Sequence, residues 1–107
     1  MTESLAGNRY AKSLIGLSIE KDALEVVYKD MLLISTTVAS CNDLDVLLKS
    51  PVVKTDKKQE ILTAIFGKNT TELTKQFLLL ISSRNREALI GDIANAFVRQ
   101  YKVIKKI

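Results

Sequence analysis

Apolar residues recur every three or four positions along most of the 107-residue chain, which is the spacing of an amphipathic helix. No segment alternates apolar and polar residues with period two, and no turn dipeptide such as Asn-Gly joins two β-rich runs. We therefore predict an all-α fold, a single-domain bundle of about six helices over residues 1–107. The predicted helices cover approximately residues 3–18, 23–41, 44–49, 55–66, 70–83 and 87–107.

Capping residues and breakers predict where these helices begin and end. The residues expected at helix starts are, in chain order, Thr2, Asp22, Asn42, Thr55 and Asn69, the last followed by Glu72 as in a capping box. Pro51 ends the third helix, and Gly67 closes the fourth from the C′ position. The inward stripes are predicted to be Leu24, Val27, Tyr28, Met31, Ile34 and Val38 in the second helix, and Ile90, Ile93, Phe97, Tyr101 and Ile104 in the last.

One stretch departs from the amphipathic pattern. Phe77-Leu-Leu-Leu-Ile81 holds five consecutive large apolar residues and has no polar face. In isolation it could be a buried strand. However, Leu73, Phe77 and Leu80 continue a helical stripe across it, and Leu is not a preferred strand residue. We interpret the stretch as part of a helix.

The first helix shows a similar excess of apolar surface. Tyr10, Leu14 and Leu17 form one face, and a second apolar face with Ala11, Ile15 and Ile19 lies beside it. Two interpretations remain open. The first and fifth helices could both lie at the centre of the bundle, wrapped by the others. Alternatively, each buries one face and gives the other to a shared groove, where an amphipathic helix of a partner would dock.

Composition suits a soluble domain with a single core. Apolar residues make up 47% of the chain and charged residues 26%, and the length is enough for one modest core. The longest apolar run is far below the ~18–20 residues needed to cross a bilayer, and no signal peptide is recognisable at the N-terminus. The single cysteine, Cys41, is expected to be structural and suits a reducing compartment, so a cytoplasmic location is expected.

The residues needed for most catalytic and metal chemistry are missing from the sequence. There is no histidine, and one cysteine cannot form a thiolate metal site. Gly67-Lys68 is not a phosphate-binding loop, because Leu62 stands where that loop needs a glycine and Asn69 where it needs Ser or Thr. We expect no catalytic residue, no metal and no cofactor, and we expect the function to lie in a surface.

Three segments resemble a known family in the right order. "NRYAKSLIGLS" resembles the opening of the δ subunit of bacterial F-type ATP synthase, known in mitochondria as the oligomycin-sensitivity-conferring protein. The resemblance is carried by Arg9-Tyr10-Ala11 and Leu14, by Leu47, Leu48, Pro51, Lys57 or Lys58 and Ile61-Leu62 in "LLKSPVVKTDKKQEIL", and by Arg86, Ile93, Phe97 and Tyr101 near the C-terminus. Ser13 stands where the family usually has alanine, and Glu87 where it commonly has leucine. Family members are also longer than this chain, which covers their N-terminal domain.

The resemblance implies a non-catalytic stator domain. Its first and fifth helices would form a groove for the N-terminal helix of an α subunit, with Tyr10, Ser13, Leu14 and Leu17 on one side and Leu73, Phe77, Leu80 and Ile81 on the other. The domain would hold the catalytic head to the peripheral stalk during proton-driven ATP synthesis, at the cytoplasmic face of the bacterial inner membrane. The stalk's b subunits would bind the C-terminal part that this chain does not cover.

Two other interpretations use the same features. The net charge of +4 is uneven, with −2 over residues 1–50 (five basic, seven acidic) and +6 over residues 51–107 (eleven basic, five acidic). This would suit a small helical RNA-binding module similar to transcription antitermination factors. Against it, only four of the sixteen basic residues are Arg and no aromatic residue is interleaved with a basic cluster, so we expect no nucleic-acid partner. A homo-oligomer would use the apolar faces on a second copy.

Overall fold

The computed structural model describes residues 4–106, and these residues form helices without any strand. The elements are α1 (Leu5–Glu20), α2 (Leu24–Ser40), α3 (Asn42–Lys49), α4 (Thr55–Phe66), α5 (Glu72–Ser83), the short 3-10 turn η1 (Glu87–Leu89) and α6 (Ile90–Lys105). The all-α prediction and the number of helices are confirmed. The expected last helix is divided, because its first three residues form the 3-10 turn.

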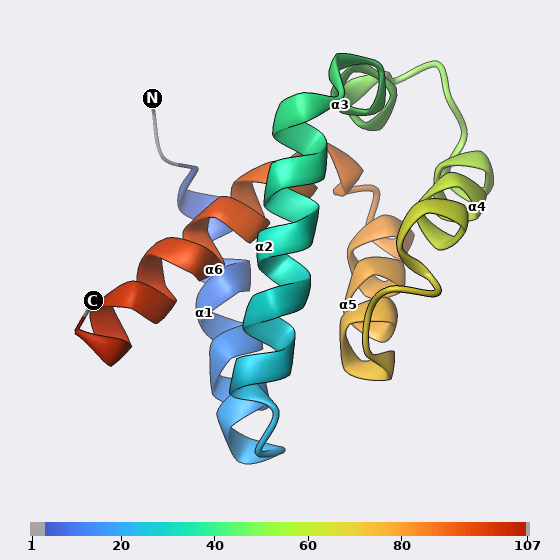
Figure 1. The fold of residues 1–107 in the computed structure, drawn as a ribbon. Coiled ribbons are helices and arrows are strands. Elements are labelled where there is room, and N and C mark those ends of the chain that lie inside the picture. The colour runs from blue at the N-terminus through green and yellow to red at the C-terminus, as the bar shows by residue number, and fades with distance from the viewer. Residues whose placement is uncertain (1–3, 107) are drawn as a thin grey trace.

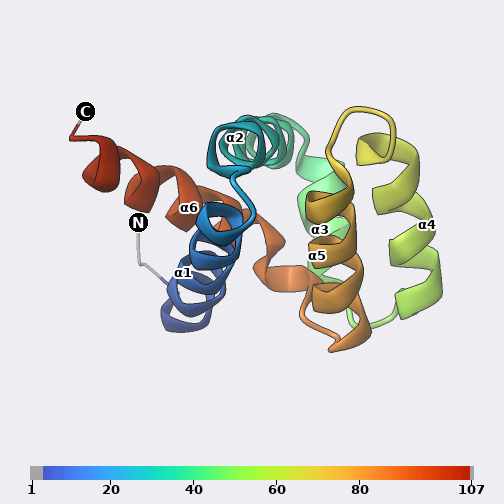
Figure 2. The same cartoon turned by 90° about the horizontal axis from the view of Figure 1, so that it is seen from below.

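The helices form two groups that share one core. Figure 1 shows α2 crossing in front of α1 and α6, and these three helices pack closely on one another. On the other side, α4 and α5 lie next to each other as a hairpin, and Figure 2 shows α5 on the inner side of that pair. α3 turns away from the end of α2 and packs on α2 and η1.

The buried side chains come from all six α-helices. The predicted stripe of α2 is confirmed: Val27, Met31 and Ile34 are buried, and its other members pack partly buried against the core. The stripe of α6 is confirmed as far as Tyr101. Ile104 was wrongly included, because it lies in the last turn of α6, beyond the helices that cover the rest, and is exposed.

Hydrogen bonds between α1 and α6 bring residues near the two ends of the described chain into contact. The Arg99 guanidinium donates from Nη2 to Oδ1 of Asn8 at 2.8 Å, and Gln100 Nε2 donates to the carbonyl oxygen of Asn8 at 3.1 Å. Close approach depends on Gly7, since a Cβ at that position would lie 3.0 Å from Cβ of Asp92 on α6. A larger residue at Gly7 would push the two helices apart.

Most of the predicted caps were wrong. Ser4 caps α1 by accepting a hydrogen bond from the Gly7 amide at 3.0 Å, while the expected cap, Thr2, lies outside the described residues. The cap positions of α2 and α3 are occupied by Ala23 and Cys41, so Asp22 and Asn42 do not cap these helices. Asp22 instead adopts the left-handed region with φ of 54° in the tight turn between α1 and α2.

The later boundaries were predicted better. Thr55 begins α4 as predicted, and Pro51 follows the end of α3. Gly67 closes α4 from the C-cap position and not from the predicted C′ position. Its φ of −61° is right-handed, unlike the left-handed conformation of a C′ glycine. The capping box at Asn69 is also wrong, because Thr71 is the N-cap of α5.

No single helix among residues 4–106 is long and apolar enough to cross a bilayer. α2 and α3 together have the length and composition of one span, but they meet at an angle of 98°. Their apolar side chains contribute to the core, which accounts for that composition.

Candidate functional site

The apolar run in α5 points in three directions. Phe77 and Ile81 face the core, where Phe77 meets α2 and α6 through Met31, Ile34, Ile90 and Ile93. Leu78 and Leu79 face α4. Leu73 and Leu80 are seven positions apart and therefore lie on the same side of α5, the side away from α4. The run therefore combines core, helix-pairing and surface positions in one turn and a half.

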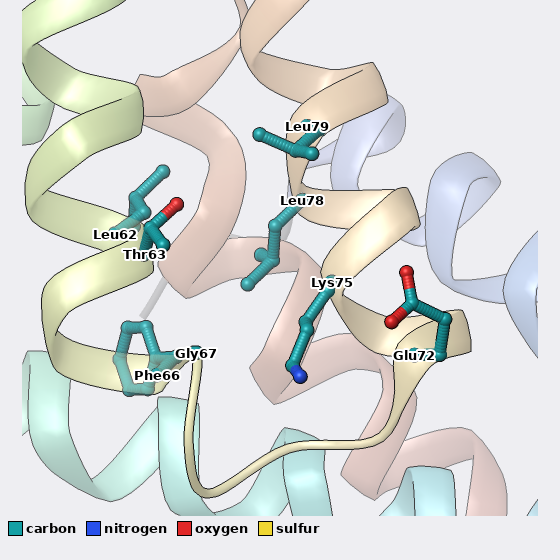
Figure 3. A pocket seen from close by; sticks show the side chains of 8 residues that line it. All are labelled: Leu62, Thr63, Phe66, Gly67, Glu72, Lys75, Leu78 and Leu79. Atoms are coloured by element: carbon teal, nitrogen blue, oxygen red, sulfur yellow. The ribbon is translucent and has the colours of Figure 1, made fainter.

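A shallow hollow lies between α4 and α5. Its empty volume is about 470 Å³, including space open to solvent. Figure 3 shows the Leu62 and Phe66 side chains on the α4 side, with Leu78 and Leu79 facing them from α5. The Lys75 side chain runs along the rim. Leu78 and Leu79 therefore lie on the side of α5 that pairs with α4.

The other flank of α5 faces α1. In Figure 2, α5 lies between α4 and α1. Helical spacing puts Leu73 and Leu80 on the side of α5 away from α4, and we infer that this side faces α1. On α1, Ile19 lines a depression with Lys105 near the end of α6. By helical spacing, Tyr10, Ser13 and Leu17 lie on the flank of α1 opposite Ile19, and we infer that this flank turns toward α5. We call this surface, defined by Tyr10, Ser13, Leu17, Leu73 and Leu80, the α1–α5 face.

The eight residues expected at the groove divide by burial. Leu14, Phe77 and Ile81 are buried in the core. Tyr10 and Leu73 are half-buried, and Ser13 is exposed. Leu17 and Leu80 are exposed, Leu80 by 45% of its surface. The five residues of the α1–α5 face are therefore at least partly accessible in this structure, whereas the other three belong to the core.

A buried carboxylate fixes the beginning of α5. Asp30 on α2 is only 6% exposed, and its Oδ2 atom accepts three hydrogen bonds from α5 and its cap. The donors are Thr71 N at 2.9 Å, Thr71 Oγ1 at 2.8 Å and Thr74 Oγ1 at 2.7 Å. Thr71 Oγ1 also accepts the Thr74 amide at 3.5 Å, which begins the helix.

Hydrogen bonds also hold the far end of α5. The Glu87 side chain is buried, and its Oε2 accepts a hydrogen bond from Ser82 Oγ at 3.1 Å. Thr55 Oγ1 donates to Oδ1 of Asn85 at 2.6 Å, which ties the start of α4 to the turn after α5. Both ends of α5 are therefore fixed by side chains of other elements.

A charged cluster fixes the last turns of α6 to α2. Tyr101 donates from its hydroxyl to Oε1 of Glu25 at 2.5 Å, and Lys105 Nζ lies 2.9 Å from the other carboxylate oxygen. The Tyr101 ring stacks on Tyr28 with centroids 3.7 Å apart. The hydrogen bond to Glu25, helped by burial, raises the pKa of Tyr101 to about 12. The same hydrogen bond, together with Lys105, lowers the pKa of Glu25 below its ordinary value.

Comparison with known proteins identifies the family. A family model described as "ATP synthase delta (OSCP) subunit" matches residues 6–107. The chain belongs to this family. The δ-subunit resemblance found in the sequence is thereby confirmed.

Individual relatives agree with this assignment. The chain is 38% identical over 102 residues to the ATP synthase subunit delta of Cytophaga hutchinsonii, which is 95% of this chain and 56% of the relative. It is 34% identical over 107 residues to that of Flavobacterium psychrophilum, covering 100% and 60% of the two chains. The subunit of Amoebophilus asiaticus is 37% identical over 100 residues, covering 94% and 54%. This δ-family chain thus spans somewhat more than half the length of the curated relatives it matches.

Within this δ-family chain, the described residues contain no group of three or more His, Cys, Asp or Glu side chains placed to hold a metal ion. Cys41 is exposed at the junction of α2 and α3, rather than packed in the core as a structural residue would be. The residues that define the α1–α5 face are all uncharged.

Sequence reasoning missed Asp30 because a lone acid next to Lys29 looks like an ordinary surface charge. A signal was present, since Asp30 occupies the apolar stripe of α2 between Val27 and Ile34. An acid on the inward stripe of a helix requires buried hydrogen-bond donors from another element.

Proposed function

We propose that this chain is the α-subunit-binding part of a non-catalytic stator subunit of F-type ATP synthase. In this proposal the α1–α5 face binds an amphipathic helix from the N-terminus of an α subunit. The bound domain helps to hold the catalytic head to the peripheral stalk, at the cytoplasmic face of the bacterial inner membrane, and so supports proton-driven ATP synthesis. Contact with b subunits belongs to the length of the relatives that this chain does not cover.

The exposed apolar side chains on facing flanks of α1 and α5 carry the proposal. Leu73 and Leu80 are separated by two helical turns, about 10 Å along the axis. That spacing matches the anchors of a partner helix at positions i, i+3 or i+4, and i+7. Leu17 and Tyr10 provide a second row of the same length on α1. The small Ser13 side chain between them leaves room for a close approach.

The proposal predicts binding dominated by apolar contact. The five residues that form the α1–α5 face are all uncharged. Affinity should therefore change little with ionic strength, in contrast to the steep salt dependence of nucleic-acid binding. Membership of the δ family supports the identity of the partner.

The test is titration of the 107-residue chain with a peptide that copies the N-terminal helix of the same organism's α subunit. We expect saturable 1:1 binding. Leu80→Asp should weaken it by more than about tenfold, because a charge would be buried in the apolar contact. Tyr10→Ala should also weaken binding, by the loss of an aromatic anchor.

Leu79→Asp is the matched control. Leu79 is 44% exposed, almost the same as Leu80, but it faces α4 on the opposite flank of the same helix. A face-specific partner should distinguish these two neighbours, so Leu79→Asp should bind the peptide as the unchanged chain does. Absence of binding at high peptide concentration, or equal losses for both variants, would refute the proposal.

A further inference from the structure

The two walls of the α1–α5 face belong to different helix groups. α1 packs chiefly on α6, whereas α5 packs on α4 and α2. Helix α2 packs on α1, α5 and α6, so it connects α5 directly with α1. A residue that fixes α5 on α2 also fixes the width of the space between Leu17 and Leu80.

Asp30 on α2 is joined to the start of α5 by directional hydrogen bonds. All three of its hydrogen bonds end on a single oxygen, Oδ2, and come from both the backbone and the side chains at the start of α5. Hydrogen bonds to a charged acceptor are shorter and stronger than neutral ones, and the carboxylate also meets the positive end of the α5 dipole. Burial shields the cluster from competing water.

The cluster does more than begin α5. Thr71 already supplies the N-cap from within the segment by accepting the Thr74 amide. Asp30 lies 41 residues before Thr71, on another helix, so its bonds contribute helix-to-helix placement beyond local capping. The apolar contacts of Phe77 with α2 and α6 are not directional, and the Ser82–Glu87 hydrogen bond holds only the far end of α5, so without Asp30 the start of α5 could shift.

We propose that Asp30 is a positioning residue for the partner-binding face: through Thr71 and Thr74 it sets the distance and rotation of α5 relative to α1. The importance of this placement for partner affinity rests on the proposed function. The placement itself does not, because it concerns the free chain. Asp30 does not touch the partner.

Three variants test the role. Asp30→Ala removes the acceptor. Asp30→Asn removes the charge but keeps a carbonyl oxygen, whose two lone pairs can still accept hydrogen bonds from the start of α5. Asp43→Ala is the matched control, since Asp43 is an exposed acid in the first turn of α3. Should Asp30→Ala fail to fold, Thr74→Val removes one of the three donors with little change in shape and takes its place.

The first measurement is the distance between spin labels on α1 and α5, without any peptide. Labels are attached at Ser13→Cys and Gln76→Cys in a chain carrying Cys41→Ser. We expect Asp30→Ala to broaden or displace the distance distribution, while Asp30→Asn and Asp43→Ala leave it unchanged. An unchanged distribution in folded Asp30→Ala, or in folded Thr74→Val where that variant replaces it, overturns the proposal.

The second measurement is peptide affinity at a temperature where every variant is folded. We expect about a tenfold loss for Asp30→Ala, with recovery to near the original affinity in Asp30→Asn. Equal affinities despite a shifted label distance would overturn the link between placement and binding. If the unchanged chain does not bind the peptide, the proposed function fails, and the label distances still decide the role of Asp30.

Discussion

The division of the apolar run in α5 between core and surface can be tested with two neighbouring alanine variants. Ile81 is 0% exposed and Leu80 is 45% exposed, and each substitution removes three carbon atoms. At about 0.8 kcal/mol per buried carbon, the transfer contribution for Ile81→Ala is about 2.4 kcal/mol, and the cavity left behind raises the loss to about 4 kcal/mol. For Leu80→Ala only about half of the side chain leaves an apolar surrounding and no closed cavity forms, so we expect about 1.3 kcal/mol.

Equilibrium urea unfolding, followed by far-ultraviolet circular dichroism, measures both losses. The urea dependence of the free energy of unfolding should stay constant, so that the midpoints report stability directly. Leu78→Ala should resemble Ile81→Ala, because Leu78 is also buried, and Leu79→Ala should resemble Leu80→Ala. A loss for Leu80→Ala as large as that for Ile81→Ala would refute the reasoning. It would mean that Leu80 is covered in the isolated chain and is not free to contact a partner.

Two further predictions concern a turn and a titrating side chain. At Asp22, where φ is 54°, the glycine variant should have a free energy of unfolding about 1 kcal/mol higher than the alanine variant. At Asp43, which is helical, the alanine variant should be the more stable one. Urea unfolding of the four variants measures both differences. Tyr101 has its pKa raised to about 12, so the stability contributed by its protonated hydroxyl is fully present below pH about 10 and is lost as the pH rises toward 12. Ultraviolet titration should show a tyrosinate step near pH 12 that Tyr101→Phe removes, and a variant that keeps this step would contradict the assignment.

The helices could be predicted because the apolar side that each helix buries follows from the spacing of its residues. Apolar residues three or four positions apart must lie on one side of a helix, whatever the rest of the fold does. The caps failed because they depend on the backbone conformation of a single residue. Asp22 has the composition of a cap but a left-handed φ, and Thr71 caps α5 in a segment whose position is fixed by Asp30, far away in sequence. Local sequence carries no information about that partner.

The candidate site was only partly predictable for a related reason. A helical wheel groups Leu14 with Leu17 and Phe77 with Leu80, but it does not say which member of each pair faces the core. The outcome depends on where α6 and α2 lie, and they cover Leu14 and Phe77 while leaving Leu17 and Leu80 exposed. The family resemblance pointed to α1 and α5, which stays a prediction, and the tertiary arrangement determines which residues on these two helices remain accessible.

The pairing of α1 with α6 has a consequence for synthesis on the ribosome. α1 is made before the other described helices, whereas α6, which covers most of its apolar face, is made after them, and Gln100 can donate to Asn8 only after more than ninety intervening residues. At about 5–20 residues per second, this delay lasts several seconds. During that time Ala11, Leu14 and Ile15 have no α6 to cover them. The nascent chain therefore exposes an apolar stripe of α1 that α6 covers in the folded protein.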